Sequence, residues 1–258
     1  MAEALLQARG IVKHYGHVEA LRGADFDVFP GEIVALIGDN GAGKSTLVKI
    51  LSGTEQADEG EIGLEGQTVQ VSSPLEAQRL GIETVYQDLA LAPDLDGAAN
   101  LYFGREILRR GLLGRLGFLD DRAMHAGARK AFAELGVDLQ NAQSPVANLS
   151  GGQRQSVAVA RSVAWANKVI FLDEPTAALG VVQTARVLDV IRRIRDRGVP
   201  VVLVSHNMPQ VLQVADRIEV LRLGRRVARF DAGGATIEQL VAAMTGGLDA
   251  QGPAAGPA

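Results

Sequence analysis

Cysteine is absent from this chain of 258 residues, and aromatic residues make up only 4% of it. Without cysteine there is no disulfide, no thiolate nucleophile and no thiolate-bound metal. The formal net charge of −4 disfavours a nucleic-acid coat or a polybasic membrane anchor, since both need clustered positive charge. The start at Met1 lacks a secretion signal, and apolar runs such as 199–204 are strand-sized and too short for a membrane span. We expect a cytoplasmic protein that would need a partner chain for any work in a membrane.

The first third of the chain combines strand patterns with one helix. Residues 5–12 and 21–29 alternate as strands do, and 61–71 reads as two short antiparallel strands around a Glu65-Gly66 turn. The run 33–37 is almost wholly apolar, which is typical of a strand buried on both faces, and a helix follows at 44–51. These patterns predict an N-terminal antiparallel β subdomain beside a buried sheet.

The rest of the chain divides into a helical part and an alternating part. Residues from about 88 to 166 favour helices, including 122–135 and 153–165, with an irregular surface excursion at 105–117. After Lys168, strand and helix patterns alternate, which indicates βαβ units and a mostly parallel sheet. We therefore predict an α/β fold with an inserted helical subdomain at about 88–166. The whole forms one domain over residues 1–246, and the Gly-, Ala- and Pro-rich tail 247–258 is expected to be disordered.

A glycine-rich loop, Gly38-Asp39-Asn40-Gly41-Ala42-Gly43-Lys44-Ser45-Thr46, joins the predicted strand 33–37 to the predicted helix 44–51. Glycines let several backbone N–H groups aim at one anion, and a helix N-terminus favours negative charge. Lys44 adds a charge for the β- and γ-phosphates, and Ser45 adds a hydroxyl for magnesium. A plain glycine-rich turn would not need this strand-to-helix context, so we predict a nucleoside triphosphate site.

An acidic pair, Asp173 and Glu174, ends the apolar run 169–172. Carboxylates at the end of a buried strand can hold magnesium through water and polarise an attacking water. Solvated strand-end acids are the alternative, and the apolar run together with the following Pro175 disfavours it. We predict that Glu174 is the general base and Asp173 the magnesium-linked partner.

The third motif is Leu149-Ser150-Gly151-Gly152-Gln153. A hydroxyl and free N–H groups at the start of a helix form a second anion-binding end. Taken alone, the motif fits an ordinary helix N-cap equally well. One γ-phosphate does not need two such ends in the same pocket.

The order and spacing of these three motifs resemble the ATP-binding cassette (ABC) ATPases over nearly the whole chain. This resemblance implies ATP and Mg²⁺ as ligands and a head-to-tail homodimer, in which each chain gives its signature motif to the ATP held by the other. It implies that Tyr15 stacks on adenine, that Gln87 senses magnesium and the γ-phosphate, and that His206 contacts the γ-phosphate. In this family the residues that contact nucleotide would be Tyr15, Gly38, Asn40, Gly41, Gly43, Lys44, Ser45, Thr46, Ser150, Gly151, Gly152 and Gln153, those near the metal Ser45, Gln87 and Asp173, and the catalytic ones Glu174, His206 and Gln87.

One loop departs from the family pattern. After the acidic strand the family usually has Ala-Leu-Asp, whereas this chain has Ala177-Ala178-Leu179-Gly180. The missing carboxylate puts a contact across the dimer in doubt, although ATP binding does not depend on it.

The resemblance implies a transport ATPase that drives a separate integral membrane permease from the cytoplasmic face of the inner membrane. The runs 174–181 and 205–208 look like those of monosaccharide importers of the ribose, xylose and fructose type. A periplasmic or surface solute-binding protein would then be an indirect partner, and nucleic acid would not be one. Two alternatives are a soluble ABC ATPase acting on ribosomes or nucleic acid, and an importer ATPase for a non-sugar solute. A generic P-loop kinase leaves the run 149–153 unexplained.

Overall fold

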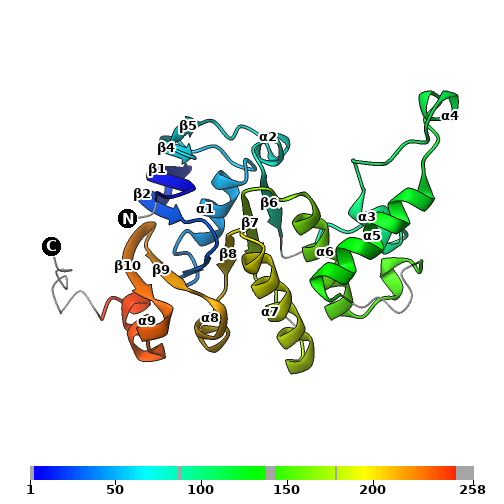
Figure 1. The fold of residues 1–258 in the computed structure, drawn as a ribbon. Helices are drawn as coiled ribbons and strands as arrows, with labels where there is room; N and C mark the ends of the chain where they lie inside the picture. The colour runs from blue at the N-terminus through cyan, green and yellow to red at the C-terminus, as the bar shows by residue number, and fades with distance from the viewer. Residues whose placement is uncertain (1–2, 87–88, 138–142, 178, 248–258) are drawn as a thin grey trace.

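The computed structural model describes residues 3–86, 89–137, 143–177 and 179–247. Its strands are β1 (Leu6–Tyr15), β2 (Val18–Val28), β3 (Ile33–Ile37), β4 (Glu59–Leu64), β5 (Gln67–Val69), β6 (Ile82–Val85), β7 (Val169–Asp173), β8 (Val201–Val204), β9 (Arg217–Arg222) and β10 (Arg225–Asp231). Its α-helices are α1 (Lys44–Leu51), α2 (Pro74–Arg79), α3 (Gly97–Leu101), α4 (Leu112–Arg115), α5 (Asp121–Leu135), α6 (Gly151–Trp165), α7 (Val181–Asp196), α8 (Met208–Val214) and α9 (Ile237–Thr245). Figure 1 shows these elements in place.

A central sheet of six strands in the order β10-β9-β3-β8-β7-β6 carries the core. All neighbouring pairs are parallel except the β9–β10 hairpin. Alternate side chains enter different cores: Ile170 and Leu172 pack with α5, α6 and α7, whereas Val169 and Phe171 pack with α1 and the N-terminal strands. Burial on both faces explains why these strands are continuous apolar runs in the sequence.

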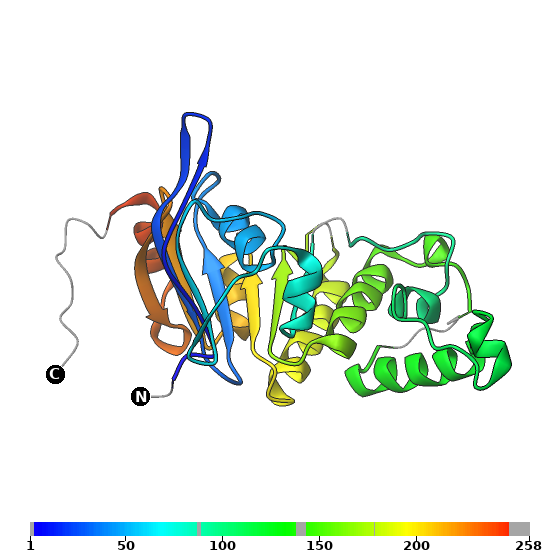
Figure 2. The same cartoon turned by 90° about the horizontal axis from the view of Figure 1, so that it is seen from above.

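The second sheet is antiparallel, with the order β2-β1-β4-β5. Glu65 and Gly66 join β4 to β5, and both have positive φ, 53° and 75°. Positive φ at both central residues defines a type I′ turn, whose twist matches that of the two flanking strands. The Glu65-Gly66 pair was expected to form this turn. Figure 2 shows the β1–β2 hairpin, in dark blue, projecting beyond the other strands.

Helices fill the chain between β6 and β7 in its described part, and Figure 1 shows them beyond one end of the central sheet. The predicted helix 153–165 is wrong at its start, because α6 begins at Gly151 with Ser150 as its N-cap. The expected irregular excursion at 105–117 contains the short helix α4. The α/β fold class is confirmed. The division into one domain at 1–246 with a helical subdomain at about 88–166 stays a prediction, and the tail from residue 248 lies outside the described residues.

Five elements that the sequence patterns did not predict are α2, β6, β9, β10 and α9. Strand β6 is short, and β10 alternates between half-exposed and exposed residues. Both lie at sheet edges, where their neighbours and not their own apolar content define them. No helix within the described ranges combines the length and apolarity needed to cross a bilayer.

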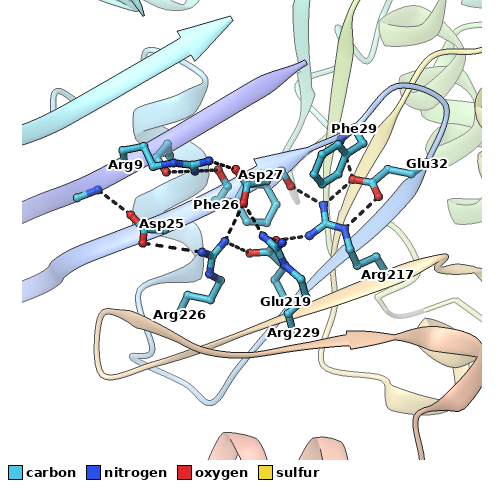
Figure 3. A network of polar contacts seen from close by, with 12 residues as sticks. Arg9, Asp25, Phe26, Asp27, Phe29, Glu32, Arg217, Glu219, Arg226 and Arg229 are labelled. Carbon is cyan, nitrogen blue, oxygen red and sulfur yellow. Dashed lines mark hydrogen bonds and ion pairs between the residues drawn. The ribbon is translucent and has the colours of Figure 1, made fainter. Parts of the chain in front are cut away.

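A charged network joins the two sheets (Figure 3). At its centre lie two buried carboxylates, Asp27 on β2 and Glu219 on β9. Arg226 bridges them, donating to Asp27 Oδ2 at 3.0 Å and to Glu219 Oε2 at 3.2 Å. Arg229 contacts both acids as well, and Arg9 and Arg217 each contact one. Burial alone would raise the pKa of Asp27, but hydrogen bonds from the surrounding arginines outweigh it and hold that pKa below its ordinary value.

We expect Asp27→Asn to destabilise the protein by about 3 kcal/mol at pH 7, because it removes the buried charge to which Arg9, Arg226 and Arg229 are paired. The folded-state pKa is depressed, so the Asp27 charge stabilises the fold above the unfolded pKa, near 4, and is lost as pH falls through the folded value. Denaturant unfolding at several pH values should therefore show a gap between wild type and variant that narrows below about pH 4.

Asp25→Asn is the matched control. Asp25 lies 3.8 Å from Arg226 with its side chain 42% exposed, and its Oδ1 accepts from Gly10 N, a bond that asparagine can keep. An equal loss of stability in both variants would contradict a central role for the buried carboxylate.

Candidate active site

The carboxyl ends of three neighbouring parallel strands place the predicted catalytic segments together. In the register of the sheet, Val204 on β8 lies opposite Leu36 on β3 and opposite Asp173 on β7. Three segments therefore leave the sheet together at the carboxyl ends of its parallel strands: the glycine-rich loop after β3, Glu174 after β7 and His206 after β8. Open parallel sheets bind their ligands at the carboxyl ends of their strands.

The glycine-rich loop holds a conformation that requires glycine at two positions. Gly43 has φ 101°, and a Cβ there would lie 2.7 Å from the carbonyl oxygen of Ala20. A Cβ on Gly38 would lie 2.2 Å from the carbonyl oxygen of Leu221. Helix α1 starts at Lys44 with no side-chain cap, so its first N–H groups have no side-chain acceptor. An anion is the natural partner of such a helix end.

Lys44 points back into this loop. Its Nζ donates to the carbonyl oxygens of Gly38 at 2.7 Å and Asp39 at 2.9 Å. Burial lowers the pKa of Lys44, and the nearby charges of Glu174, Asp39 and Asp173 oppose that shift. Burial also raises the pKa of Asp173, with the Glu174 charge adding to it and Lys44 opposing it. The ammonium and the acidic pair thus share one partly buried space.

Glu174 is held in an unusual backbone conformation. Its φ is 50°, which is rare outside glycine, and its N–H donates to the carbonyl oxygen of Val204 at 3.0 Å. Its Oε1 lies 2.7 Å from Nδ1 of His206, and because a carboxylate accepts, Nδ1 is the donor. The Glu174 side chain is 16% exposed and that of His206 is 73% exposed. Backbone strain of this kind is concentrated at functional sites, and here it occurs at the residue whose carboxylate contacts the histidine.

Gln210, which the sequence patterns did not indicate, supports the segments at the carboxyl end of the sheet. Thr176 Oγ1 donates to Oε1 of Gln210 on α8 at 2.5 Å, which ties the segment after the acidic pair to the helix after His206. Asn207 caps that helix by accepting from the N–H of Gln210. Gln210 carries no motif, and only its tertiary contact with Thr176 reveals it.

Two of the three predicted metal-site residues lie in the described part of the chain. Ser45, exposed, is in the first turn of α1, and Asp173 ends β7. Gln87 falls outside the described residues. Within the described residues no group of three or more His, Asp or Glu side chains could hold a metal ion. A hydroxyl with a carboxylate fits Mg²⁺, which usually binds to one or two protein ligands together with substrate phosphates and water.

The predicted adenine-stacking residue lies at the end of the projecting β1–β2 hairpin. Tyr15 is 42% exposed, and Lys13 Nζ lies 5.7 Å from the centre of its ring. In the glycine-rich loop, Asn40 and Gly41 are exposed and Thr46 is half-buried in the first turn of α1. All four positions are accessible to a ligand in this chain.

The signature motif forms a complete helix cap. Ser150 N donates to Gln153 Oε1 at 2.9 Å, and Gln153 N donates to Ser150 Oγ at 3.3 Å. These reciprocal bonds form a capping box. Gly151 is exposed, and a Cβ added there would lie no closer than 3.9 Å to Leu179, whereas a Cβ on Gly152 would lie 2.6 Å from Gln183. No hydrogen bond or ion pair between described residues joins 149–153 to the loop 38–46.

A glycine-rich loop and strand-end acids at the carboxyl end of a parallel sheet are the features of a P-loop nucleoside triphosphatase. The family model for ABC transporters matches residues 21–177, and the chain belongs to this family as its ATP-hydrolysing cassette.

Curated relatives match nearly the whole chain. It is 54% identical over 246 residues to the fructose import ATP-binding protein FrcA of Rhizobium meliloti, covering 95% of each chain. It is 43% identical to the xylose/arabinose import ATP-binding protein XylG of Sulfolobus acidocaldarius, covering 93% of this chain and 94% of that protein. It is 41% identical to the ribose import ATP-binding protein RbsA 1 of Rubrobacter xylanophilus, covering 94% of this chain and 47% of that protein.

Solved structures share the fold. The ADP conformation of an ATP-binding cassette of an ABC transporter matches with a TM-score of 0.75 at 24% identity, covering 95% of this chain and 96% of that one. A dimeric ATP-binding cassette bound to ADP and Pi after hydrolysis matches with a TM-score of 0.73 at 23% identity, covering 89% of this chain and 100% of that one. At these identities the likeness is one of fold.

We expect Glu174→Gln to bind ATP normally and to hydrolyse it about 10²–10⁴-fold more slowly, because glutamine keeps the size of the side chain but cannot accept the proton of water. Nucleotide affinity and steady-state phosphate release measure the two effects separately. Glu134→Gln on α5, whose carboxylate is 45% exposed, is the control and should behave as wild type. Wild-type turnover in Glu174→Gln would remove Glu174 from the reaction.

Proposed function

We propose that the chain is the ATP-hydrolysing subunit of an importer for a monosaccharide. The observation that carries the sugar assignment is 54% identity to a fructose import ATP-binding protein over 95% of both chains. The relatives with xylose/arabinose and ribose names support the same substrate class. The cassette would span residues 1–246, with the helical subdomain at about 88–166.

In the proposed reaction Glu174 is the general base for the attacking water. Its Oε1 is occupied by His206, so Oε2 is the oxygen left to accept a proton from water. His206 orients this carboxylate and, being largely exposed, can also reach a γ-phosphate at the mouth of the site. The strained backbone at Glu174 fixes the carboxylate before substrate arrives, which lowers the cost of reaching the reactive geometry.

The phosphates would lie in the glycine-rich loop at the start of α1. Lys44 now donates to two carbonyl oxygens, and phosphate oxygens of ATP would replace them as acceptors. Gly38, Asn40, Gly41 and Gly43 would supply backbone N–H groups, with Ser45 and Thr46 at the helix start and Tyr15 stacking on adenine. Mg²⁺, when bound, neutralises phosphate charge, and Ser45, Asp173 and Gln87 are the residues that would hold it.

We further propose that the site is completed by a second copy of the chain. The signature 149–153 caps its own helix, and no hydrogen bond or ion pair among the described residues joins it to its own glycine-rich loop. Gly151 is exposed, and a Cβ there would meet only Leu179, at 3.9 Å, so a phosphate of the other chain can approach Ser150, Gly151, Gly152 and Gln153. The dimeric structure of a cassette with the same fold supports this arrangement.

A membrane permease is the proposed direct partner, and a solute-binding protein outside the membrane is the indirect one. The working location would be the cytoplasmic face of the plasma membrane. The acidic balance of the chain disfavours ribosomes or nucleic acid as the alternative partner.

Mixing two inactive variants tests the composite site. Lys44→Ala removes the phosphate-facing charge, and Gly151→Asp places a carboxylate where a γ-phosphate would lie, which like-charge repulsion disfavours. Each homodimer has two damaged sites, whereas their heterodimer has one intact site and one with both defects. We expect ATPase activity to recover partly on mixing, and about one tight ATP per dimer to bind.

The reverse arrangement is the control for this mixing experiment. Both substitutions on one chain, mixed with wild type, give a heterodimer with one defect in each site. Titrating in this double variant should lower the activity of wild type. Absence of both recovered hydrolysis and a single tight ATP site in the first mixture would defeat the composite-site proposal.

Uptake of labelled sugars tests the transport assignment. In a strain lacking the gene for this chain, the wild-type chain should restore uptake of at least one of fructose, xylose and ribose. Glu174→Gln should not restore it, because the permease cycle needs hydrolysis. Restoration of a non-sugar solute alone would contradict the sugar assignment and leave the ATPase assignment intact.

A further inference from the structure

The excursion between α3 and α5 exposes more apolar side chains than its surroundings. We call residues 107–119, which include α4, the apolar tip. Seven large apolar residues lie in it: Ile107, Leu108, Leu112, Leu113, Leu116, Phe118 and Leu119. All but Ile107 are exposed, with Leu112 at 72% and Leu116 at 66%. Exposed apolar residues gathered in this way mark an interaction site.

The apolar tip has a fixed shape. Its two arms are joined by hydrogen bonds from Arg109 N to Phe118 O at 2.9 Å and from Asp120 N to Ile107 O at 2.7 Å. Arg109 Nε also donates to Leu119 O at 3.1 Å. Figure 1 shows α4 at the far end of this excursion, away from the sheets. The leucines are therefore held outward by an ordered turn.

The charge of the apolar tip is opposite to that of the chain. It contains Arg109, Arg110 and Arg115 and no acidic residue, whereas the whole chain has a net charge of −4. Arg110 and Arg115 are exposed, and neither guanidinium makes a hydrogen bond or ion pair with the described residues. Their charges are free to meet an anionic partner.

We propose that the apolar tip docks on an anionic lipid surface. Arginines interleaved with leucine and phenylalanine suit the interface of a bilayer, where apolar side chains enter the acyl boundary and cations meet phosphate headgroups. The tip is a projection, and five cavities of the described residues are all lined by other segments. A projecting apolar and basic surface matches a lipid interface better than a groove-bound peptide. The cassette would then touch the membrane directly, independently of any permease.

Vesicle co-sedimentation of the purified full chain tests this proposal. Vesicles of phosphatidylglycerol mixed with phosphatidylcholine should bind the chain more tightly than vesicles of phosphatidylcholine alone, and the difference should fade at high salt. Arg110→Gln with Arg115→Gln should weaken binding to the anionic vesicles about thirtyfold. Leu112→Ser with Leu116→Ser should weaken binding to both vesicle types at least about tenfold.

Val241→Ser with Arg225→Gln is the matched control. Both residues are exposed, on α9 and β10, far from the apolar tip, and the pair should bind vesicles as wild type does. Unchanged melting temperatures show that every variant is folded. Equal binding to both vesicle types, or wild-type binding by the tip variants, would overturn the proposal. If the tip variants lost association with a permease in detergent but bound vesicles as wild type does, the partner of the tip would be a protein instead.

Discussion

The parallel register of β3, β8 and β7 is the constraint on which the candidate site depends. Because Leu36, Val204 and Asp173 lie side by side, three segments far apart in the chain turn away from the sheet at one level. The hydrogen bond from Glu174 N to Val204 O continues this register one residue beyond the strand. A slip of one residue would turn Asp173 to the opposite face and separate Glu174 from His206.

Burial on both faces makes that register secure. Val169 and Phe171 enter one core, and Ile170 and Leu172 enter the other. A shift of β7 by one residue would therefore remove apolar side chains from both cores. The network around Asp27 and Glu219 fastens the antiparallel sheet to the same core through buried carboxylates, each shared among several arginines. A rigid scaffold of this kind can hold Glu174 at a positive φ that an isolated peptide would not keep.

The signature motif shows how one set of atoms can have two uses. In this chain Ser150 and Gln153 satisfy each other and cap α6, which is the ordinary role of such residues. The capping box uses the N–H of Gln153, while exposed Gly151 leaves the first turn of the helix open to an incoming anion. The same cap therefore stabilises the single chain and prepares the surface that the composite-site proposal needs.

Local sequence patterns were sufficient to predict those features that depend on neighbouring residues in the chain. The limits of β3 and α1, the Glu65-Gly66 turn and the glycine-rich loop follow from apolar runs, glycine positions and a strand-to-helix change, and each has a short-range physical cause. The contact of Glu174 with His206, the support from Gln210 and the pairing of Arg226 with two acids join residues between 7 and 199 positions apart. Only tertiary structure could decide these, because strand order and register bring such residues together and no local pattern encodes the distance between them.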